Sequence, residues 1–482
     1  MRQHPIRFAI LVPLALAIYA PVAWANVKLP SIIGSNMVLQ RDRPLPIWGW
    51  ADPGEEVTVT LGDAKASAKA DAQGNWQVKL PARKASATPI EMTIAGKDTV
   101  KLTGIVVGEV WLCSGQSNME WSVAQSTNAQ QEIADSNHPL IRHIKIPHTP
   151  ADKPQSNVES KGWEVCSPQT SAAFTATGYY FARHLRLQLD VPIGLIGSNW
   201  GGTRIEPWTP PEGFRQVAAL KGIADNLEKY PEKLADGKIN HQSALALYNG
   251  MIKPLVPFAM RGALWYQGES NNGEGMLYFE KMKALIQGWR AVWSDPEMPF
   301  LFVQLAPYKY GGDDTALAGI WEAQTATLAL PHTGMAVTTD ISTIGDIHPP
   351  NKQDVGKRLA LWALAHTYGK KDVAHSGPLY ASMEVEGGKV RLKFTHTAGA
   401  LVARDGKELT WFSIAGEDKQ FHKAEAKIDG ESVVVSCPAV PKPVAVRFGW
   451  NQIAEPNLSN KAGLPASPFR TDKWTDGKNA AP

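Results

Sequence analysis

The segment from residue 109 to residue 371 alternates between short apolar runs and longer amphipathic segments. The apolar runs end in Gly, Ser or Asn and include VPIGLIGSNWGGT, ARGALWYQGESN, PFLFVQLAPY and GMAVTTDIS. Amphipathic segments such as GYYFARHLRLQLD and NKQDVGKRLALWALAHTYG have the apolar spacing of helices, and Asn351 is placed to cap the last one. This alternation predicts an α/β fold with helices on both faces of a parallel central sheet. Ligands of such sheets bind beyond the carboxyl ends of the strands.

Two regions with a strand pattern flank this segment. Residues 26–108 contain EEVTVTLGD and GNWQVKLP, in which apolar and polar residues alternate, and DAQGN supplies a turn between them. We therefore expect an N-terminal β-sandwich domain without catalytic groups. Residues 372–482 contain two predicted hairpins, with turns at Gly387-Gly388 and Asp429-Gly430, which indicate a C-terminal β-rich domain and tail.

Residues 1–25 have the pattern of a cleavable secretory signal peptide, because Arg2 and Arg7 precede an apolar stretch that ends in the small-residue triplet Ala23-Trp24-Ala25. The apolar stretch is shorter than the ~20 residues that span a bilayer. We therefore expect a secreted or periplasmic protein with no membrane association after cleavage. Cleavage lowers the formal net charge from +3 to +1, and no basic cluster indicates a nucleic-acid partner. The oligomeric state stays open.

The chain has three cysteines, Cys113, Cys166 and Cys437. In an oxidising compartment Cys113 and Cys166 are the first pair to test for a disulfide, but three buried reduced thiols fit the sequence equally well. Catalysis by Cys113 is less attractive, because a thiol within an apolar run tends to stay protonated.

Four short polar clusters follow the predicted strands of the middle segment. They are GQSN at 115–118, NWGGT at 199–203, QGESN at 267–271 and GDIHP at 345–349. Loops that follow the strands of a doubly wound sheet converge on one edge, so we expect these clusters to meet. Together they contain a serine, glycine amides, carboxamides and an Asp/His pair, which are the parts needed for acyl transfer.

Each part has a distinct chemical task. Serine is a weak nucleophile until a base takes its proton, and His348 could do so for Ser117, with an acidic neighbour to fix the tautomer of the ring. A tetrahedral oxyanion needs preorganised donors, which the N–H groups of Ser117 and Gly201 and an amide of Gln267 or Asn271 could supply. Taken alone, Ser117 fits a helix N-cap as well as a nucleophile; the four ordered clusters favour the nucleophile.

The blocks CSGQSNMEW, GLIGSNWGGTRIEPW, LWYQGESN and DIHPPNKQDVGKRLALWALA, in this order, resemble the serine, glycine, asparagine and histidine blocks of the SGNH (GDSL-like) hydrolases. More closely, they resemble the sialate O-acetylesterase family within that superfamily. The resemblance extends to NMVLQRDRPLPIWGWADPGEEVTVT near the start and GLPASPFRTD near the end. It implies a three-layer SGNH-type catalytic domain over residues 109–371 and serine carboxylesterase activity without a cofactor.

Carried over by position, the resemblance implies Ser117 as the nucleophile, His348 as the general base and acid, and Gly201 as an oxyanion donor. For the third block, Gln267 and Asn271 both stay candidates for oxyanion donors.

The acid departs from the superfamily pattern of Asp-x-x-His, because Gly345 lies three residues before His348. Asp346, two residues before, is the first candidate, because in an extended or turn segment it can share a side with the histidine. Asp340 is the second candidate, and a backbone carbonyl is the third possibility.

Substrate contacts are predicted from two further side chains. Arg204 could hold a substrate carboxylate by a bidentate contact, which suits a sialic acid, although pairing with Glu206 or Glu269 fits equally well. Trp121 could stack on a sugar ring or pack at the rim of the site. Glu269 fits a carboxylate that orients the serine loop better than it fits a general acid.

Three histidines, His138, His143 and His148, recur at every fifth residue, which fits neither a helical nor a strand arrangement of metal ligands. We therefore predict no metal and no other cofactor. The favoured hypothesis is an exported serine carboxylesterase that removes O-acetyl groups from carbohydrates, first of all O-acetylated sialic acids, through an acetyl-serine intermediate. Acetylated xylan or another plant polysaccharide is the alternative substrate. A hypothesis of another class is a non-catalytic carbohydrate-binding protein on a degenerate hydrolase scaffold.

Overall fold

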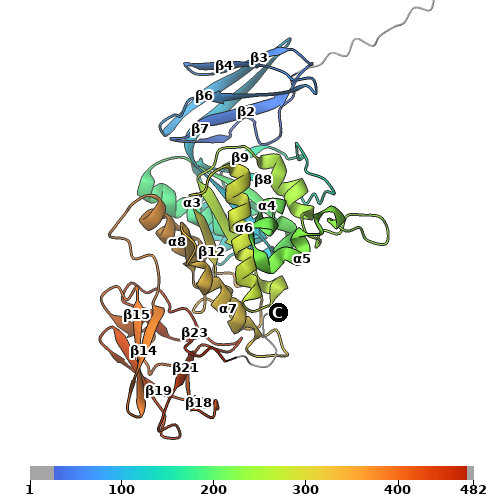
Figure 1. Ribbon diagram of the computed structural model, residues 1–482. Coiled ribbons are helices and arrows are strands. Elements are labelled where there is room, and N and C mark those ends of the chain that lie inside the picture. The colour runs from blue at the N-terminus through green and yellow to red at the C-terminus, as the bar shows by residue number, and fades with distance from the viewer. Residues whose placement is uncertain (1–26, 475–482) are drawn as a thin grey trace, which may run out of the picture.

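A computed structural model describes residues 27–474 of the chain (Figure 1). Its central sheet has the strand order β13-β12-β11-β7-β10-β8-β9. All neighbouring strands are parallel except β8 and β9. The prediction of an α/β fold with a parallel central sheet is therefore confirmed for all strands of this sheet except β9, which is antiparallel. The strands are β7 (Thr99–Gly115), β8 (His138–Lys145), β9 (Trp163–Cys166), β10 (Ile193–Asn199), β11 (Gly262–Tyr266), β12 (Phe300–Val303) and β13 (Thr333–Ala336).

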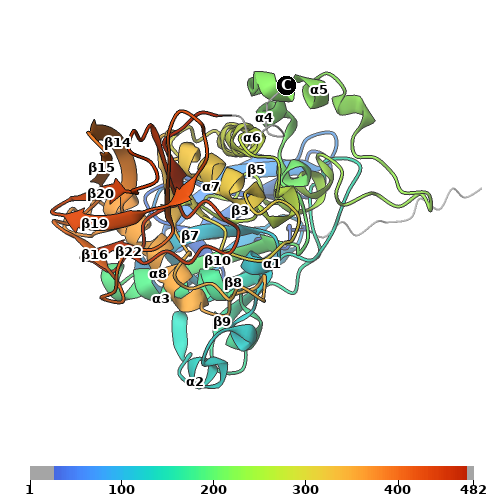
Figure 2. The same ribbon diagram turned by 90° about the horizontal axis from the view of Figure 1, so that it is seen from below.

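Helices cover both faces of this sheet. Figure 2 shows α6 (Leu277–Trp293) and α7 (Ala316–Thr327) on one side of β7 and β10, and α3 (Ala176–Leu189) and α8 (Lys352–Trp362) on the other. As predicted, Asn351 caps α8, because its side-chain oxygen accepts the backbone N–H of Asp354. The shorter helices are α1 (Ser117–Glu120), α2 (Ala129–Ala134), α4 (Pro211–Gln216) and α5 (Lys221–Ala224).

The N-terminal strands are joined to the central sheet through β7. Up to residue 107 this strand pairs with β6, and from residue 109 it pairs with β10. The expected boundary between residues 108 and 109 therefore lies inside one continuous strand. The other strands are β1 (Val38–Gln40), β2 (Leu45–Trp50), β3 (Glu56–Leu61), β4 (Ala64–Lys69), β5 (Asn75–Leu80) and β6 (Ser86–Ala95). Their inward-facing residues share one apolar core with the central sheet.

The C-terminal strands form their own apolar core at the opposite end of the molecule (Figure 1). Both predicted hairpins are present, since β14 pairs with β15 across Gly387-Gly388 and β19 pairs with β20 across Asp429-Gly430. The strands are β14 (Leu379–Glu386), β15 (Lys389–Thr395), β16 (Leu401–Ala403), β17 (Phe412–Ala415), β18 (His422–Lys423), β19 (Glu425–Asp429), β20 (Ser432–Ser436), β21 (Ala445–Phe448), β22 (Leu458–Asn460) and β23 (Phe469–Arg470).

The three cysteines carry free thiols, so the structure contains no Cys113–Cys166 disulfide and agrees with the alternative of reduced cysteines. Burial in β7 raises the pKa of the Cys113 thiol far above its usual range, which leaves it a poor nucleophile. The predicted signal peptide lies outside the described residues. Within residues 27–474 no helix is both long enough and apolar enough to cross a membrane.

Candidate active site

Ser117 lies where β7 ends and α1 begins. At Gly115 the backbone has a positive φ of 130°, and a Cβ atom there would lie 2.2 Å from the carbonyl oxygen of Tyr266. Only glycine tolerates both conditions, so this residue sets the sharp turn into the helix. Gln116 takes the N-cap position and Ser117 is the first helical residue, so the N-cap interpretation of Ser117 is wrong. Its hydroxyl is therefore free to face the site.

The hydroxyl of Ser117 and the ring of His348 are within hydrogen-bond distance, with Oγ 2.8 Å from Nε2. The two residues are 231 positions apart in the sequence, and the fold brings their loops together at the carboxyl edge of the sheet. Trp121 stacks on the imidazole at a centroid distance of 4.7 Å and an interplanar angle of 16°. This contact holds the plane of the histidine ring.

The pKa of His348 lies below the ordinary value of 6.5. Partial burial is the main cause, because it disfavours the charged imidazolium; the carboxylate of Asp346 opposes the shift, and the ammonium of Lys352 adds to it. The ring is consequently neutral at neutral pH and able to accept the proton of Ser117.

Of the two acid candidates, Asp346 lies beside the ring and Asp340 does not contact it. Asp346 Oδ1 accepts the backbone N–H of His348 at 2.8 Å and lies 3.7 Å from Nδ1, a distance too long for a hydrogen bond. Asp340 forms a bidentate pair with Arg358, with both contacts at 2.6 Å. Within the described chain, Nδ1 of His348 also donates to no backbone carbonyl. Asp346 therefore acts on the ring through charge and turn geometry.

The expected oxyanion donors differ in their availability. The backbone N–H of Ser117 makes no hydrogen bond within residues 27–474. Gly201 lies next to it, since a Cβ atom at Gly201 would be 3.2 Å from Ser117 Cβ. The N–H of Gly201, however, donates to Glu120 Oε2 at 2.8 Å. A carboxylate thus occupies one donor of the expected pair.

The carboxamides of the third block, Gln267 and Asn271, donate all their hydrogen bonds to other groups of the protein. Gln267 Nε2 donates to Gln116, to the carbonyl of Thr203 and to Asn271, at 3.2, 3.0 and 2.8 Å. Asn271 Nδ2 donates to two carboxylates at 3.1 Å each, those of Glu206 and Glu274. Because all their N–H groups have internal acceptors, both residues brace the loops, and neither presents a free donor to an oxyanion as the sequence had led us to expect.

Arg204 is held by acidic neighbours. Its guanidinium contacts Glu206 Oε1 at 3.1 Å and also pairs with Glu274, and Lys281 binds the same two carboxylates at 2.7 and 2.6 Å. Of the two partners considered from the sequence, Glu206 is confirmed and Glu269 is wrong. Contact with a substrate carboxylate would compete with these pairs.

The remaining predicted residues are placed as follows. Trp121 offers at most its other face to a sugar, because His348 covers one face. Trp200 lies between two histidine rings, His148 at 4.3 Å and His241 at 4.6 Å. His143 is fully buried, and His148 Nε2 lies 2.9 Å from Glu120. The part of the chain that the structure describes holds no cluster of three or more potential metal ligands.

Three polar residues at the site escaped the sequence interpretation: Asn118, Glu120 and Lys352. Asn118 Nδ2 donates to Glu269 Oε1 at 2.6 Å, which agrees with the expectation that Glu269 orients the serine loop. Lys352 Nζ donates to Asn118 Oδ1 at 2.6 Å. The signal for both was positional, since Asn118 follows Ser117 directly and Lys352 lies four residues after His348 at the start of a helix.

A sequence model described as "Carbohydrate esterase, sialic acid-specific acetylesterase" matches residues 107–365. Sialate O-acetylesterases from Pongo abelii and Homo sapiens are each 30% identical over 514 residues, covering 95% of this chain and 96% of each relative. The chain belongs to the sialate O-acetylesterase family. It is a carboxylic ester hydrolase, and the non-catalytic alternative is set aside.

A solved structure supports this family membership. A carbohydrate acetylesterase from Xanthomonas citri is 40% identical and superposes with a TM-score of 0.86, covering 93% of this chain and all of that protein. The family's fold therefore extends beyond the central sheet to the flanking strands on both sides.

Proposed function

We propose that this member of the family hydrolyses O-acetyl esters on carbohydrates through an acetyl-serine intermediate. The observation that carries the proposal is the 2.8 Å contact between Ser117 Oγ and His348 Nε2 at the edge of the sheet where ligands of such folds bind. A neutral imidazole within proton-transfer distance of a serine hydroxyl is the arrangement that activates the serine as a nucleophile. The family membership and the carbohydrate acetylesterase from Xanthomonas citri support the same chemistry.

The reaction takes two acyl transfers. Ser117 Oγ attacks the acetyl carbonyl while His348 Nε2 takes the hydroxyl proton. His348 then gives this proton to the departing sugar oxygen, which leaves as an alcohol and breaks the C–O bond of the ester. In the second half, His348 deprotonates a water that attacks the acetyl-serine, and acetic acid leaves while Ser117 recovers its proton.

The oxyanion of each tetrahedral intermediate needs the N–H groups of Ser117 and Gly201. Glu120 must then release Gly201, because a carboxylate and an oxyanion cannot share one donor without repulsion. Two side chains can bind the released carboxylate, because Glu120 Oε1 is 2.9 Å from His148 Nε2 and 3.7 Å from Lys145 Nζ. We propose that Glu120 turns fully toward these two side chains during turnover.

For the substrate, we propose O-acetylated sialic acids first, on the strength of the family that the chain matches. Arg204 favours a sialic acid less than the sequence suggested, because Glu206 and Glu274 already neutralise the guanidinium. Acetylated plant polysaccharide therefore stays as the second substrate class. Acetate release from a panel of both substrate classes separates them, and Arg204→Ala should lower only the sialate rate if the guanidinium binds the sugar carboxylate.

The test of the chemistry is Ser117→Ala. We expect this variant to keep the thermal unfolding midpoint of the wild type and to lose hydrolysis of 4-nitrophenyl acetate and labelling by a fluorophosphonate. A folded variant that still cleaves the ester at the original rate would refute the proposal.

The finer description of the fold belongs to the same proposal. We propose three-layer SGNH-type packing for residues 109–371, with the segments 26–108 and 372–482 as flanking β domains, the first of which shares its apolar core with the central sheet. We also propose export, on the pattern of residues 1–25 alone. Amino-terminal sequencing of the mature protein should begin at Asn26, and a retained leader would contradict the proposed cleavage.

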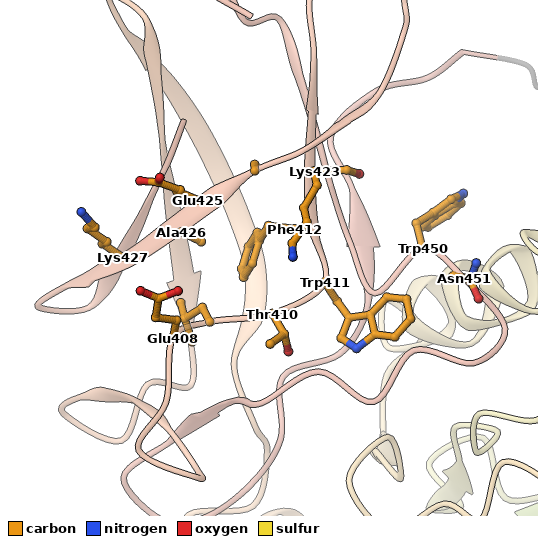
Figure 3. Close-up of a pocket in the computed structure, with 13 residues that line it drawn as sticks. Glu408, Thr410, Trp411, Phe412, Lys423, Glu425, Ala426, Lys427, Trp450 and Asn451 are labelled. Atoms are coloured by element: carbon orange, nitrogen blue, oxygen red, sulfur yellow. The ribbon is translucent and has the colours of Figure 1, made fainter. Parts of the chain in front are cut away.

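A second candidate function, glycan binding by the C-terminal strands alongside catalysis, is favoured by one groove (Figure 3). The groove has a volume of about 960 Å³ and contains Trp411, which is 39% exposed and has a positive φ of 64°. Trp450, Asn451 and the carboxylate of Glu408 also line it. An exposed indole beside polar groups suits a sugar ring. Trp411→Ala should weaken polysaccharide binding and leave 4-nitrophenyl acetate hydrolysis unchanged, with the exposed Val385→Ala as control.

A further inference from the structure

Lys352 is a buried charged residue that the reaction described above does not use. It is the first residue of α8 and is fully shielded from solvent. Its ammonium donates to Asn118 Oδ1 at 2.6 Å and to the carbonyl of Pro349 at 2.7 Å. Asn118 directly follows Ser117, and Pro349 directly follows His348. One ammonium thus contacts the serine loop and the histidine loop at once.

The carboxamide of Asn118 continues this connection. Its Nδ2 donates to Glu269 Oε1 at 2.6 Å and to the carbonyl of Ile347 at 3.0 Å. The carbonyls on both sides of His348 are therefore bound, that of Ile347 by Asn118 and that of Pro349 by Lys352. The backbone that carries the imidazole is fixed to the residue next to the nucleophile.

Burial has a large electrostatic effect on these groups. It lowers the pKa of Lys352 to about 7, although the carboxylates of Glu269 and Asp346 oppose the shift. It raises the pKa of Glu269 above its usual range. Two rings face the ammonium, that of Tyr266 at 5.2 Å and that of Trp121 at 5.9 Å, and favour the cation. The positive charge in turn disfavours the imidazolium of His348.

The site needs such a connection because, among residues 27–474, no carboxylate lies within hydrogen-bond distance of the far nitrogen of the catalytic ring. Asp346 Oδ1 is 3.7 Å from His348 Nδ1, so the acid cannot orient the imidazole by a hydrogen bond. The ring is placed instead by stacking on Trp121 and by the fixed backbone of its own loop.

We propose that Lys352 is a positioning residue: acting through Asn118 and Pro349, it holds Ser117 and His348 in contact, and in its charged form it adds to the effect of burial on the imidazole. This inference rests on the proposed function of Ser117 and His348. Lys352 is closed off from solvent, and its hydrogen bonds go to Asn118 and Pro349 and not to the reacting atoms of Ser117 or His348, so its role differs from that of a catalytic lysine.

The test is Lys352→Met, which keeps the length of the side chain and removes its charge and hydrogen bonds. We expect kcat for 4-nitrophenyl acetate to fall about 100-fold with KM unchanged, because a small displacement of reacting groups has an effect of this order. The acid limb of the pH profile of kcat/KM should move to higher pH, since the imidazolium loses a repulsive neighbour. Lys352→Arg should restore the position of that limb, and Lys352→Gln, which keeps a donor without the charge, should not.

A matched control removes a buried cation elsewhere in the same domain. Arg290 is buried and donates to the carbonyls of Met298 and Pro331, at the amino ends of β12 and β13. Arg290→Met should lower the thermal unfolding midpoint and leave kcat and the pH profile unchanged.

The inference is overturned if Lys352→Met keeps wild-type kcat, or if its acid limb stays in place while only the unfolding midpoint falls, as for Arg290→Met. Should the Met variant fail to fold, the acid limb of Lys352→Gln decides. Fluorophosphonate labelling of the wild type keeps this test apart from the proposed function. If Ser117 is labelled but Lys352→Met keeps the kcat and the acid limb of the wild type, only the inference on Lys352 is refuted. If Ser117 is not labelled, the proposed function on which the inference rests is refuted.

Discussion

Asp346→Asn removes the negative charge that lies closest to the far nitrogen of the catalytic ring. The carboxylate oxygen accepts the backbone N–H of His348 at 2.8 Å, and an asparagine oxygen can accept the same bond. The turn that carries the histidine should therefore persist. What the substitution removes is the attraction between the carboxylate and the imidazolium that forms when Ser117 gives up its proton.

The distance sets the size of this effect. Two opposite unit charges 3.7 Å apart attract by about 1 kcal/mol at the dielectric constant of water and by about 4 kcal/mol at an effective value near 20. The side chain of Asp346 is 51% exposed, so solvent screening places the attraction toward the lower figure. A loss of about 1 to 2 kcal/mol corresponds to a roughly 5- to 30-fold fall in kcat. A triad whose aspartate binds the ring directly loses about 10⁴-fold on the same substitution.

The pH profile gives a second measurement of the same interaction. The active form carries a neutral His348, so kcat/KM falls as the pH drops through the pKa of the ring, which burial places below 6.5. Because Asp346 raises this pKa, Asp346→Asn should move the acid limb to lower pH. Both quantities come from initial rates of 4-nitrophenyl acetate hydrolysis across the acid range. A thousand-fold loss of kcat, or an acid limb displaced upward, would refute this account of Asp346.

Two further substitutions test the oxyanion donors. Gly201→Ala should lower kcat at least tenfold, since the new Cβ would lie 3.2 Å from Ser117 Cβ and would displace the N–H of residue 201 from the oxyanion. Gly222→Ala, which meets open space, is the control. An unchanged rate would contradict the close packing of Gly201 against Ser117. Glu120→Gln should raise kcat several-fold, because it removes the negative charge beside the oxyanion. Glu120 carries this charge because its pKa lies below the usual value: burial raises the pKa, but the hydrogen bonds from His148 and Gly201 lower it by more. A lower rate for the folded Gln variant would contradict this expectation.

The arrangement of the catalytic sheet could be predicted from the sequence because strands that are buried on both faces appear as continuous apolar runs. β10 and β11 are buried at every position, and each is followed by glycine and polar residues where it leaves the core. The parallel direction then brings the loops after β7, β10 and β11 to one edge. His348 was harder to place, because eleven residues separate it from the end of β13 at Ala336. Its position depends on the bonds of its loop to Asn118 and Lys352.

The sequence could not show which of several possible acceptors each polar side chain at the site binds. Gln267 and Asn271 look like free carboxamides in a loop, but three acceptors surround the N–H groups of Gln267 and two carboxylates bind those of Asn271. Glu120 lies in the serine block CSGQSNMEW, but it accepts a hydrogen bond from Gly201, which lies 81 residues further along the chain in the loop after β10. Such partners are set by tertiary packing, which local patterns do not encode.

Burial and two charges act on the catalytic imidazole: burial and Lys352 disfavour the imidazolium, and Asp346 favours it. The attraction of Asp346 for the imidazolium is the larger of the two charge effects, so it is mainly burial that keeps the pKa of the ring below its ordinary value. The balance favours a neutral ring before the reaction, which suits a base. It also raises the free energy of the imidazolium once Ser117 has reacted, and this makes His348 the stronger acid toward the departing sugar oxygen. The geometry that a bonded aspartate would impose comes instead from Trp121 and from the backbone bonds of the loop.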